Sequence, residues 1–394
     1  MEKREVVVVS GTRTAIGDYG GGLKDLPATK LGAVAIREAI ARARVDPARV
    51  GHVVMGSVIH GEARDMYLSR VAAIEAGVPP GTPCLTVNRL CGSGLQAVVS
   101  AAQHILLGDC DIAVAGGAES MSRAAYFLPS GRWGQRMGDA AVVDAMTGAL
   151  HDPFGHGHMG VTAENIAAKY GFTREQQDQF AVESHKKAVR AIEQGFFKAQ
   201  VTPVEVRTRK GTEQFTTDEH VRKDASMENM AKLKAVFKKD GTVTAANASG
   251  INDAGAAVVL TDRKTAEKSN LKPMARLVAY AHAGVEPQVM GLGPIPAVRR
   301  VFEKSGLKPA DMDVVESNEA FAVQAMAVTK DLGLDPAKVN PNGGAVALGH
   351  PIGATGCILT VKALYELERT QKRYALVTMC IGGGQGIAAI FERM

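Results

Sequence analysis

The chain has 394 residues, of which 46% are hydrophobic and 22% charged, and its net charge is +5. These are globular values, and the length predicts two or more packed units rather than one. Between Glu183 and Asp240 thirteen Lys and Arg accompany nine Asp and Glu, a surplus of four, with few aromatic residues among them, which argues against nucleic acid as a partner.

The five cysteines include no Cys-x-x-Cys pair, which argues against a disulfide framework or a structural zinc site and favours a reducing compartment. Residues 1–6 contain acidic side chains and lead directly into an apolar run, unlike a targeting signal, and the C-terminus carries no peroxisomal or lipidation motif. Nor do we find an apolar run of the roughly eighteen residues that a membrane span needs. We therefore expect a cytoplasmic protein with no membrane partner.

The first third of the chain alternates strand-like and helix-like patterns. Val6–Ser10, Val53–Gly56 and Ile112–Ala115 are apolar runs typical of buried strands, and Leu31–Ala43 has the spacing of an amphipathic helix. Such alternation predicts a mostly parallel sheet covered by helices.

Cys91 occupies a turn between the strand-like run Cys84–Val87 and a helical pattern that begins at Leu95. The free N–H groups and the dipole at a helix N-terminus favour a thiolate, the form in which a cysteine is a nucleophile. The alternative is a core cysteine in front of a glycine-rich turn.

The middle of the chain, residues 118–248, has a different texture. Glycine-rich loops at 130–138 and 152–160 are followed by a polar helix opened by Thr173 and Gln176, the pattern of a capping box, and then by the basic stretch. We interpret this segment as an insertion, or lid, over the first unit.

The last third repeats the order of the first. Pro296–Lys304, Val314–Ser317, Val339–Asn340 and Leu376–Val377 follow their counterparts at a distance of roughly 250–265 residues, as expected for a duplicated α/β domain. The predicted division is an N-terminal half (1–117, returning at 249–270), the insertion (118–248) and a C-terminal half (271–394).

Three further stretches are unusually rich in polar residues and glycine: 317–322, 342–356 and 378–386. They contain Asn318, His350 and Cys380, for which a helix cap, a core histidine and a structural turn are the respective alternatives. Cys91, His350 and Cys380 all follow strand-like runs, and equivalent strand ends of a duplicated sheet converge, so we expect one pocket to hold all three.

Together these residues favour acyl transfer combined with enolate chemistry. His350 can serve as the base for a nucleophilic Cys91. Cys380, a thiol whose ordinary pKa is near 8.5, suits proton transfer at a weakly acidic carbon. The backbone N–H groups of Cys91 and Gly382 can receive an oxyanion.

The stretches 88–94, 318–321, 349–351 and 380–384 resemble the four catalytic blocks of the thiolases, in the same order and with similar spacing. Further similarity at 115–122, 158–165 and 241–253 extends the resemblance over nearly the whole chain. It implies an α/β architecture of five αβαβα layers with a loop domain, assembled as a dimer of dimers. It also implies acetyl-CoA, acyl-CoA and coenzyme A as substrates, without a further cofactor or a metal.

The resemblance assigns roles to individual residues. Cys91 is acylated, His350 activates it, and His350 with a water held by Asn318 stabilises an enolate. Cys380 removes or returns the α-proton, while the N–H groups of Cys91 and Gly382 form a second oxyanion site.

By the same resemblance, other positions contact coenzyme A or the acyl group. The coenzyme A contacts are Arg222, Lys223, His158 and Ser249, and the acyl-pocket positions are Met159, Met290 and Phe321. The stretches 157–159 and 290–294 are more similar to short-chain, biosynthetic-type β-ketothiolases than to long-chain degradative ones. The cysteines Cys84, Cys110 and Cys357 match no catalytic block and are assigned to packing.

Two alternatives remain. A decarboxylating ketosynthase of the same fold would place two histidines beside the cysteine, where this chain has Asn318 and Cys380. A non-catalytic acyl-CoA or lipid carrier would be expected to lack at least one of Cys91, His350 and Cys380.

Overall fold

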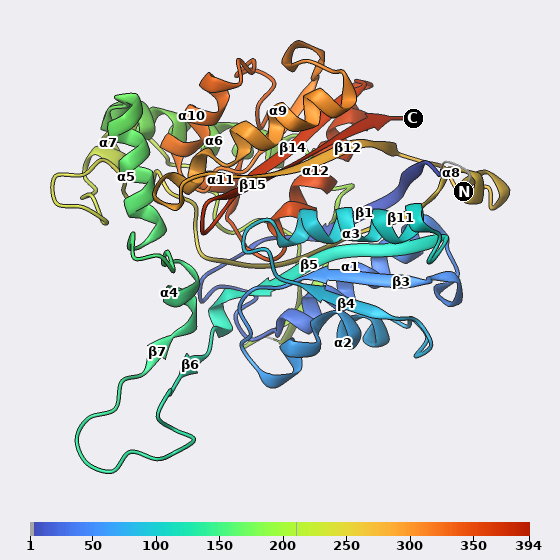
Figure 1. Ribbon diagram of the computed structural model, residues 1–394, viewed down its shortest axis with the longest axis horizontal. Coiled ribbons are helices and arrows are strands. Elements are labelled where there is room, and N and C mark those ends of the chain that lie inside the picture. Colours follow the sequence, from blue (N-terminus) through green and yellow to red (C-terminus); the bar gives the residue numbers. More distant parts are fainter. Residues whose placement is uncertain (1–3, 210) are drawn as a thin grey trace.

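The computed structural model describes residues 4–209 and 211–394. Residues 1–3 and Lys210 lie outside the described part. Residues 1–3 belong to the N-terminal stretch for which no targeting signal is predicted, and Lys210 belongs to the basic stretch. The chain forms a large mixed sheet with helices on both faces and between its two ends (Figure 1).

The strands follow the order β13-β14-β15-β12-β1-β11-β5-β3-β4. One end of the sheet comes from the first part of the chain: β1 (Val6–Thr14), β3 (His52–Gly56), β4 (Cys84–Val87), β5 (Ile112–Ser120) and β11 (Asn252–Asp262). The other end comes from the last part: β12 (Ala275–Gly284), β13 (Val314–Ser317), β14 (Tyr374–Ile381) and β15 (Gln385–Arg393). The two ends join where β1 pairs with β12, so the duplicated units share one continuous sheet.

The helices and the two ends of this sheet form five alternating layers. One outer layer contains α1 (Ala28–Ala43), which packs on β5 and β11, and α2 (Leu68–Glu75), which packs on β3, β4 and α1. The central layer pairs α3 (Ser93–Leu107), which lies on β3 and β5, with α12 (Thr355–Thr370), which lies on β13 and β14. The other outer layer holds α9 (Pro294–Ser305) on β12 and β15, with α10 (Ala322–Asp331) beside it (Figure 1). The five-layered α/β architecture is thereby confirmed.

The apolar periodicity of the central helix explains its position. Leu95, Val98, Val99 and Ile105 on α3 are completely buried, and burying each such side chain contributes about 1.5–3 kcal/mol. Because both faces of this layer are covered by sheet, α3 and α12 keep the two halves together and hold the loops in front of them in place.

The prediction of a mostly parallel sheet was wrong. β3 pairs in parallel with β4 and β5, and β13 with β14, but β1, β11, β12 and β15 pair antiparallel with their neighbours. One of these reversals lies at residues 382–384, where Gly383 and Gly384 have φ of 81° and 88°. This left-handed turn reverses the chain directly from β14 into β15, with no crossover helix between them.

The segment 118–248 combines two longer helices, α5 (Met159–Tyr170) and α6 (Arg174–Glu193), with short helices and strands. Its short helices are α4 (Ala145–Ala149) and α7 (Met227–Ala231). Its strands are β6 (Tyr126–Phe127), β7 (Val143–Asp144), β8 (Val201–Thr202), β9 (Val204–Thr208) and β10 (Gly211–Phe215), and the connection between β6 and β7 projects far from the body (Figure 1). The remaining short elements of the chain are β2 (Gly17–Asp18), α8 (Arg263–Lys268) and α11 (Ala345–Leu348). The predicted domain limits stay a prediction, and β5 runs to Ser120, past the proposed limit at 117.

Local patterns agree with the structure at most predicted elements. Thr173 caps α6 with the expected capping box, in which its side chain accepts from the N–H of Gln176. The expected strand at Val339–Asn340 is reduced to an isolated bridge between Val339 and Val315.

One apolar stretch is longer than the sequence analysis allowed. Leu90–Leu107 reaches eighteen residues with a mean hydropathy of 1.3, enough by length and composition for a spanning helix. It contains α3, and 56% of it is buried inside the protein, as is typical of the central helix of a layered fold.

Candidate active site

Cys91 is presented by a tight turn between β4 and α3. Leu90 adopts a left-handed conformation with φ of 46°, uncommon for a residue with a side chain. Asn88 Oδ1 accepts the N–H of Leu90 at 2.9 Å, and Ser93 Oγ accepts the N–H of Arg89 at 2.8 Å and donates to the Leu90 carbonyl at 2.6 Å. These bonds hold a backbone conformation that turns the cysteine out of the strand.

The acidity of Cys91 is opposite to the expectation from its place at a helix N-terminus. Burial raises the pKa of the thiol to about 11; the N–H groups of Gly382 and of Cys91 itself lower it, and the Glu119 carboxylate raises it further. A helix N-terminus contributes only about 0.3–1 kcal/mol, less than the roughly 1.4 kcal/mol of one pKa unit. The free enzyme therefore holds a thiol, and deprotonation requires a base.

His350 can provide that base. It follows Gly349, whose φ is 102°, and its N–H donates to Asn252 Oδ1 at 2.9 Å. The Thr355 hydroxyl donates its only hydrogen to the Pro351 carbonyl, so it accepts from Nδ1 of His350 at 2.7 Å. The ring proton is thereby assigned to Nδ1, which leaves Nε2 as an unprotonated base.

Two further observations define the imidazole. Burial lowers the pKa of His350 to about 4, so the ring is neutral at physiological pH. Nε2 lies 3.4 Å from the Asn318 side-chain nitrogen, while Asn318 Oδ1 is buried and lacks a hydrogen-bond partner among the described residues. This amide can hold a water beside the ring.

The second thiol, Cys380, lies next to this group near the end of β14. It is completely buried, and burial raises its pKa, as does the charge of Cys91. The two sulfurs are therefore close enough to influence each other electrostatically. The turn after Cys380 brings Gly382 to Cys91, and Ile381 packs so closely on Gly92 that an added Cβ would come within 2.7 Å of it.

A cavity of about 450 Å³ joins most of the predicted groups, but the completely buried Cys380 and Asn318 do not line it. Cys91, His350 and Gly382 line it together with the predicted coenzyme A contacts His158 and Ser249. The predicted acyl-pocket residues also line it: Met159, Met290 and Phe321.

Arg222 and Lys223 lie apart from this cavity. Both line a smaller hollow of about 190 Å³ beside α6. Arg222 forms an ion pair of 3.2 Å with Asp18, and Asp18 lines the main cavity. Arg222 thus lies at the outer edge of the site: it does not line the cavity itself but contacts Asp18, which does.

Sequence reasoning missed several residues that shape the site. Phe237 stacks on His158 with ring centroids 4.6 Å apart. His158 Nδ1 accepts the N–H of Gly160 and burial lowers its pKa to about 4, so its ring proton is on Nε2. Thr355, five residues after His350, could have been recognised as a partner of the ring, whereas Asn252 gave no local signal.

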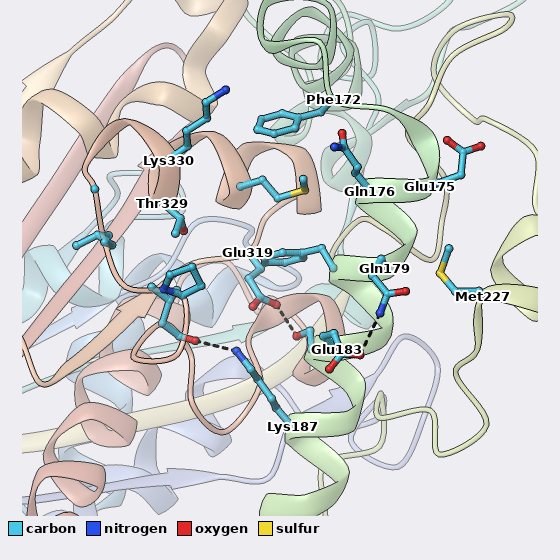
Figure 2. A pocket seen from close by; sticks show the side chains of 17 residues that line it. Phe172, Glu175, Gln176, Gln179, Glu183, Lys187, Met227, Glu319, Thr329 and Lys330 are labelled. Carbon is cyan, nitrogen blue, oxygen red and sulfur yellow. Dashed lines mark hydrogen bonds between the residues drawn. The ribbon is translucent and has the colours of Figure 1, made fainter.

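The block at Asn318 is fixed from behind by its neighbour. The Glu319 carboxylate accepts from Ser184 Oγ at 2.7 Å, from Asn340 Nδ2 at 2.8 Å and from the N–H of Val346 at 3.2 Å. Figure 2 shows Glu319 in the wall of a second cavity, of about 970 Å³, between α6 and α10. Within the described residues, no group of three or more His, Cys, Asp or Glu side chains is placed to hold a metal ion.

The pKa of Cys91 leads to a first prediction. Because iodoacetamide reacts with the thiolate, the rate of Cys91 alkylation should rise about tenfold per pH unit between about pH 7 and about pH 9, without a plateau. Peptide mass spectrometry after timed quenching measures this rate for Cys91 separately from the other cysteines. A plateau in this range would show a preformed thiolate and contradict the assignment.

Comparison with known proteins agrees with this geometry. Two family models match: the N-terminal domain of the thiolases over residues 6–264 and the C-terminal domain over residues 271–393. The chain is 65% identical to the β-ketothiolase BktB of Cupriavidus necator, over 99% of this chain and 100% of that protein. It is 50% identical to an acetyl-CoA acetyltransferase of the same organism, over 99% of each chain.

Solved structures show the same relationship. The crystal structure of human mitochondrial 3-ketoacyl-CoA thiolase has a TM-score of 0.98 and 43% identity, with 99% of both chains covered. The structure of that enzyme in complex with CoA has a TM-score of 0.96, covering 99% of this chain and 98% of that one. Family models, relatives and fold agree over the whole length, and the chain belongs to the thiolase family.

Proposed function

We propose that this thiolase is an acyl-CoA C-acyltransferase of the β-ketothiolase type. It condenses acetyl-CoA with a short acyl-CoA to a 3-ketoacyl-CoA and free coenzyme A, and it catalyses the reverse thiolysis, in both directions through an acyl thioester on Cys91. The observation that carries this proposal is a cavity lined by the Cys91 thiol and by a neutral imidazole whose Nε2 is unprotonated, with the buried Cys380 thiol close enough for its pKa to respond to the charge of Cys91.

In the first half-reaction, the Cys91 sulfur attacks the thioester carbonyl of an acyl-CoA while its proton passes to Nε2 of His350. The N–H groups of Cys91 and Gly382, which bond to the sulfur in the free enzyme, receive the carbonyl oxygen as it gains charge. The bond to the coenzyme A sulfur then breaks, and His350 returns the proton to the departing thiolate.

In the second half-reaction, acetyl-CoA takes the place of coenzyme A. Cys380 gives its proton to Nε2 of His350 and, as a thiolate, removes a proton from the α-carbon. The enolate oxygen is stabilised by protonated His350 and by a water bound to Asn318. The enolate carbon attacks the acyl group on Cys91, the bond from sulfur to the acyl carbon breaks, and His350 protonates the released sulfur.

Electrostatics supports this order of steps. A negative charge on Cys91 raises the pKa of Cys380, so both sulfurs cannot readily be thiolates at once. Acylation ends this competition, because the sulfur of the Cys91 thioester cannot ionise. Once the acyl group is in place, Nε2 of His350 is available to Cys380 alone.

The lining of the cavity and the relatives both support acyl-CoA substrates. Met159, Met290 and Phe321 form an apolar wall next to Cys91, suited to a short acyl chain. The relatives named β-ketothiolase BktB and acetyl-CoA acetyltransferase, and the CoA complex of the human enzyme, support acyl-CoA substrates. We propose that no further cofactor is needed, because the side chains supply both the nucleophile and the base.

Arg222 offers a test of the coenzyme A site. Its side chain is 60% exposed beside Asp18, where it can attract the phosphates of coenzyme A. Arg222→Ala should raise KM for coenzyme A about three- to tenfold and leave kcat within about twofold, since the interaction is absent from the reacting atoms. Steady-state thiolysis kinetics measures both constants, with Arg263→Ala, an exposed arginine paired with Glu5, as the matched control. A fall in kcat at unchanged KM would contradict this role.

We further propose a homo-oligomer, namely a tetramer, in the cytoplasm. The connection between β6 and β7 exposes a row of apolar side chains far from the body, including Trp133 at 86% and Met137 at 91% exposure. Exposed apolar surface of this kind is typical of an association site.

The experiment that tests the function compares substrates. Purified protein should cleave acetoacetyl-CoA and its five- and six-carbon 3-keto homologues only in the presence of coenzyme A, and should condense acetyl-CoA without release of carbon dioxide from malonyl-CoA. Chromatography of the CoA esters measures both reactions. Malonyl-dependent turnover would indicate a ketosynthase, and binding of acyl-CoA without turnover would indicate a carrier.

A further inference from the structure

Glu119, at the end of β5, is a buried carboxylate that takes no part in the steps above. It is completely inaccessible, and its two oxygens accept three backbone N–H groups. The donors are Val58 at 3.1 Å, Ile59 at 3.1 Å and Gly353 at 2.9 Å. Val58 and Ile59 follow β3 in the first half of the chain, whereas Gly353 lies three residues after His350. One side chain therefore connects the loop that carries His350 to the half that carries Cys91.

The backbone around this contact is packed so closely that three glycines have no room for a side chain. A Cβ on Gly353 would lie 2.6 Å from Glu119 Oε2, and a Cβ on Gly117 would lie 2.1 Å from the Gly353 carbonyl oxygen. A Cβ on Gly56 would approach the same oxygen to 2.8 Å. The His350 loop thus enters the first half between backbone segments, where the carboxylate is its polar anchor.

The charge of Glu119 also reaches the reacting sulfur. Burial raises the pKa of Glu119 to about 8, and Asp65 raises it too, but the N–H groups of Ile59, Gly353 and Val58 favour the ionised form. The carboxyl is therefore mainly protonated at neutral pH and becomes a carboxylate above about pH 8. Once ionised, its negative charge opposes ionisation of Cys91.

We propose that Glu119 is a positioning residue for the reaction: it fixes the His350 loop against the half carrying Cys91 and, when ionised, opposes a thiolate at Cys91. The inference rests on the proposed function. Its consequence is that His350 Nε2 is held in place to take the proton of Cys91.

Two substitutions separate position from charge. In Glu119→Gln the amide has one acceptor oxygen, so at least one N–H group is left facing an NH₂ group and the charge is lost. We expect kcat for thiolysis to fall about 10- to 100-fold with KM for coenzyme A nearly unchanged, because the loop is displaced. Above about pH 8, where the wild-type carboxyl is ionised, the pH profile of Cys91 alkylation should move lower by up to about one unit. Glu119→Asp keeps the charge but not the reach, so kcat should fall while the alkylation profile stays near that of the wild type.

Glu164→Gln is the matched control for the alkylation profile. Glu164 is likewise buried and accepts the N–H groups of Thr242 and Val243. A shift in Glu119→Gln but not in Glu164→Gln supports the proposal, and equal shifts overturn it because general loosening would explain both. Wild-type kcat and alkylation in Glu119→Gln also overturn it.

If Glu119→Gln does not fold, Glu119→Asp decides: unchanged kcat in folded protein overturns the proposal, as does failure of both variants to fold, which would show a purely structural role. If the wild-type enzyme shows no thiolysis, the proposed function fails, while the alkylation experiment still reports on Glu119.

Discussion

Cys91→Ala is expected to lower condensation and thiolysis by about 10⁴-fold or more, because both half-reactions pass through the thioester on this sulfur. No neighbouring group can replace it: Cys380 is completely buried behind the turn, and His350 is held by Thr355 and Asn252. Initial rates in both directions and the exchange of labelled coenzyme A into acetyl-CoA measure the loss.

The matched control is Cys357→Ala. Cys357 is also completely buried and has a raised pKa, but it lies in α12 outside the cavity, so kcat should stay within about threefold of the wild type. Retention of coenzyme A exchange in Cys91→Ala would contradict the covalent mechanism.

Cys380→Ser should separate the two half-reactions. A serine hydroxyl is far less acidic than a thiol, so α-proton removal should slow and condensation should fall about 10²- to 10⁴-fold. Acylation of Cys91 by acetyl-CoA should stay within about threefold, since His350 alone serves that step. Rapid-quench mass spectrometry follows acylation, and product chromatography follows condensation.

The choice of acyl donor gives a further test of Cys380→Ser. Acylation by acetoacetyl-CoA should be impaired together with condensation, because cleavage of that substrate releases an enolate that Cys380 must protonate. Equal loss of acylation by acetyl-CoA would show that Cys380 supports Cys91 structurally rather than moving a proton.

Much of the fold follows from local pattern. The helical spacing after Cys91 predicts α3, the capping box at Thr173 predicts α6, and the repeated order of elements predicts the two halves. The antiparallel direction of β15 relative to β14 did not follow, because the reversal between them depends on the positive φ of Gly383 and Gly384, and the presence of a glycine does not by itself specify that torsion.

The candidate site was predicted in its components rather than in its protonation states. Cys91, His350 and Cys380 stand in stretches that are unusually dense in glycine and polar residues, and this density could be recognised in the sequence. The neutral state of His350 and the thiol form of Cys91 arise from burial, and the tautomer arises from Thr355. Glu119 was not predicted because its partners are backbone N–H groups remote in sequence, at Val58, Ile59 and Gly353.

The central claim is that the Cys91 sulfur receives the acyl group. Mixing the wild-type protein with acetyl-CoA, quenching in acid and mapping the modified peptide by mass spectrometry tests it directly. The account predicts a single acetyl group on the peptide that contains Cys91, removed again when coenzyme A is added before quenching. An unmodified protein that still turns over, or an acetyl group found on Cys380 in place of Cys91, would contradict it.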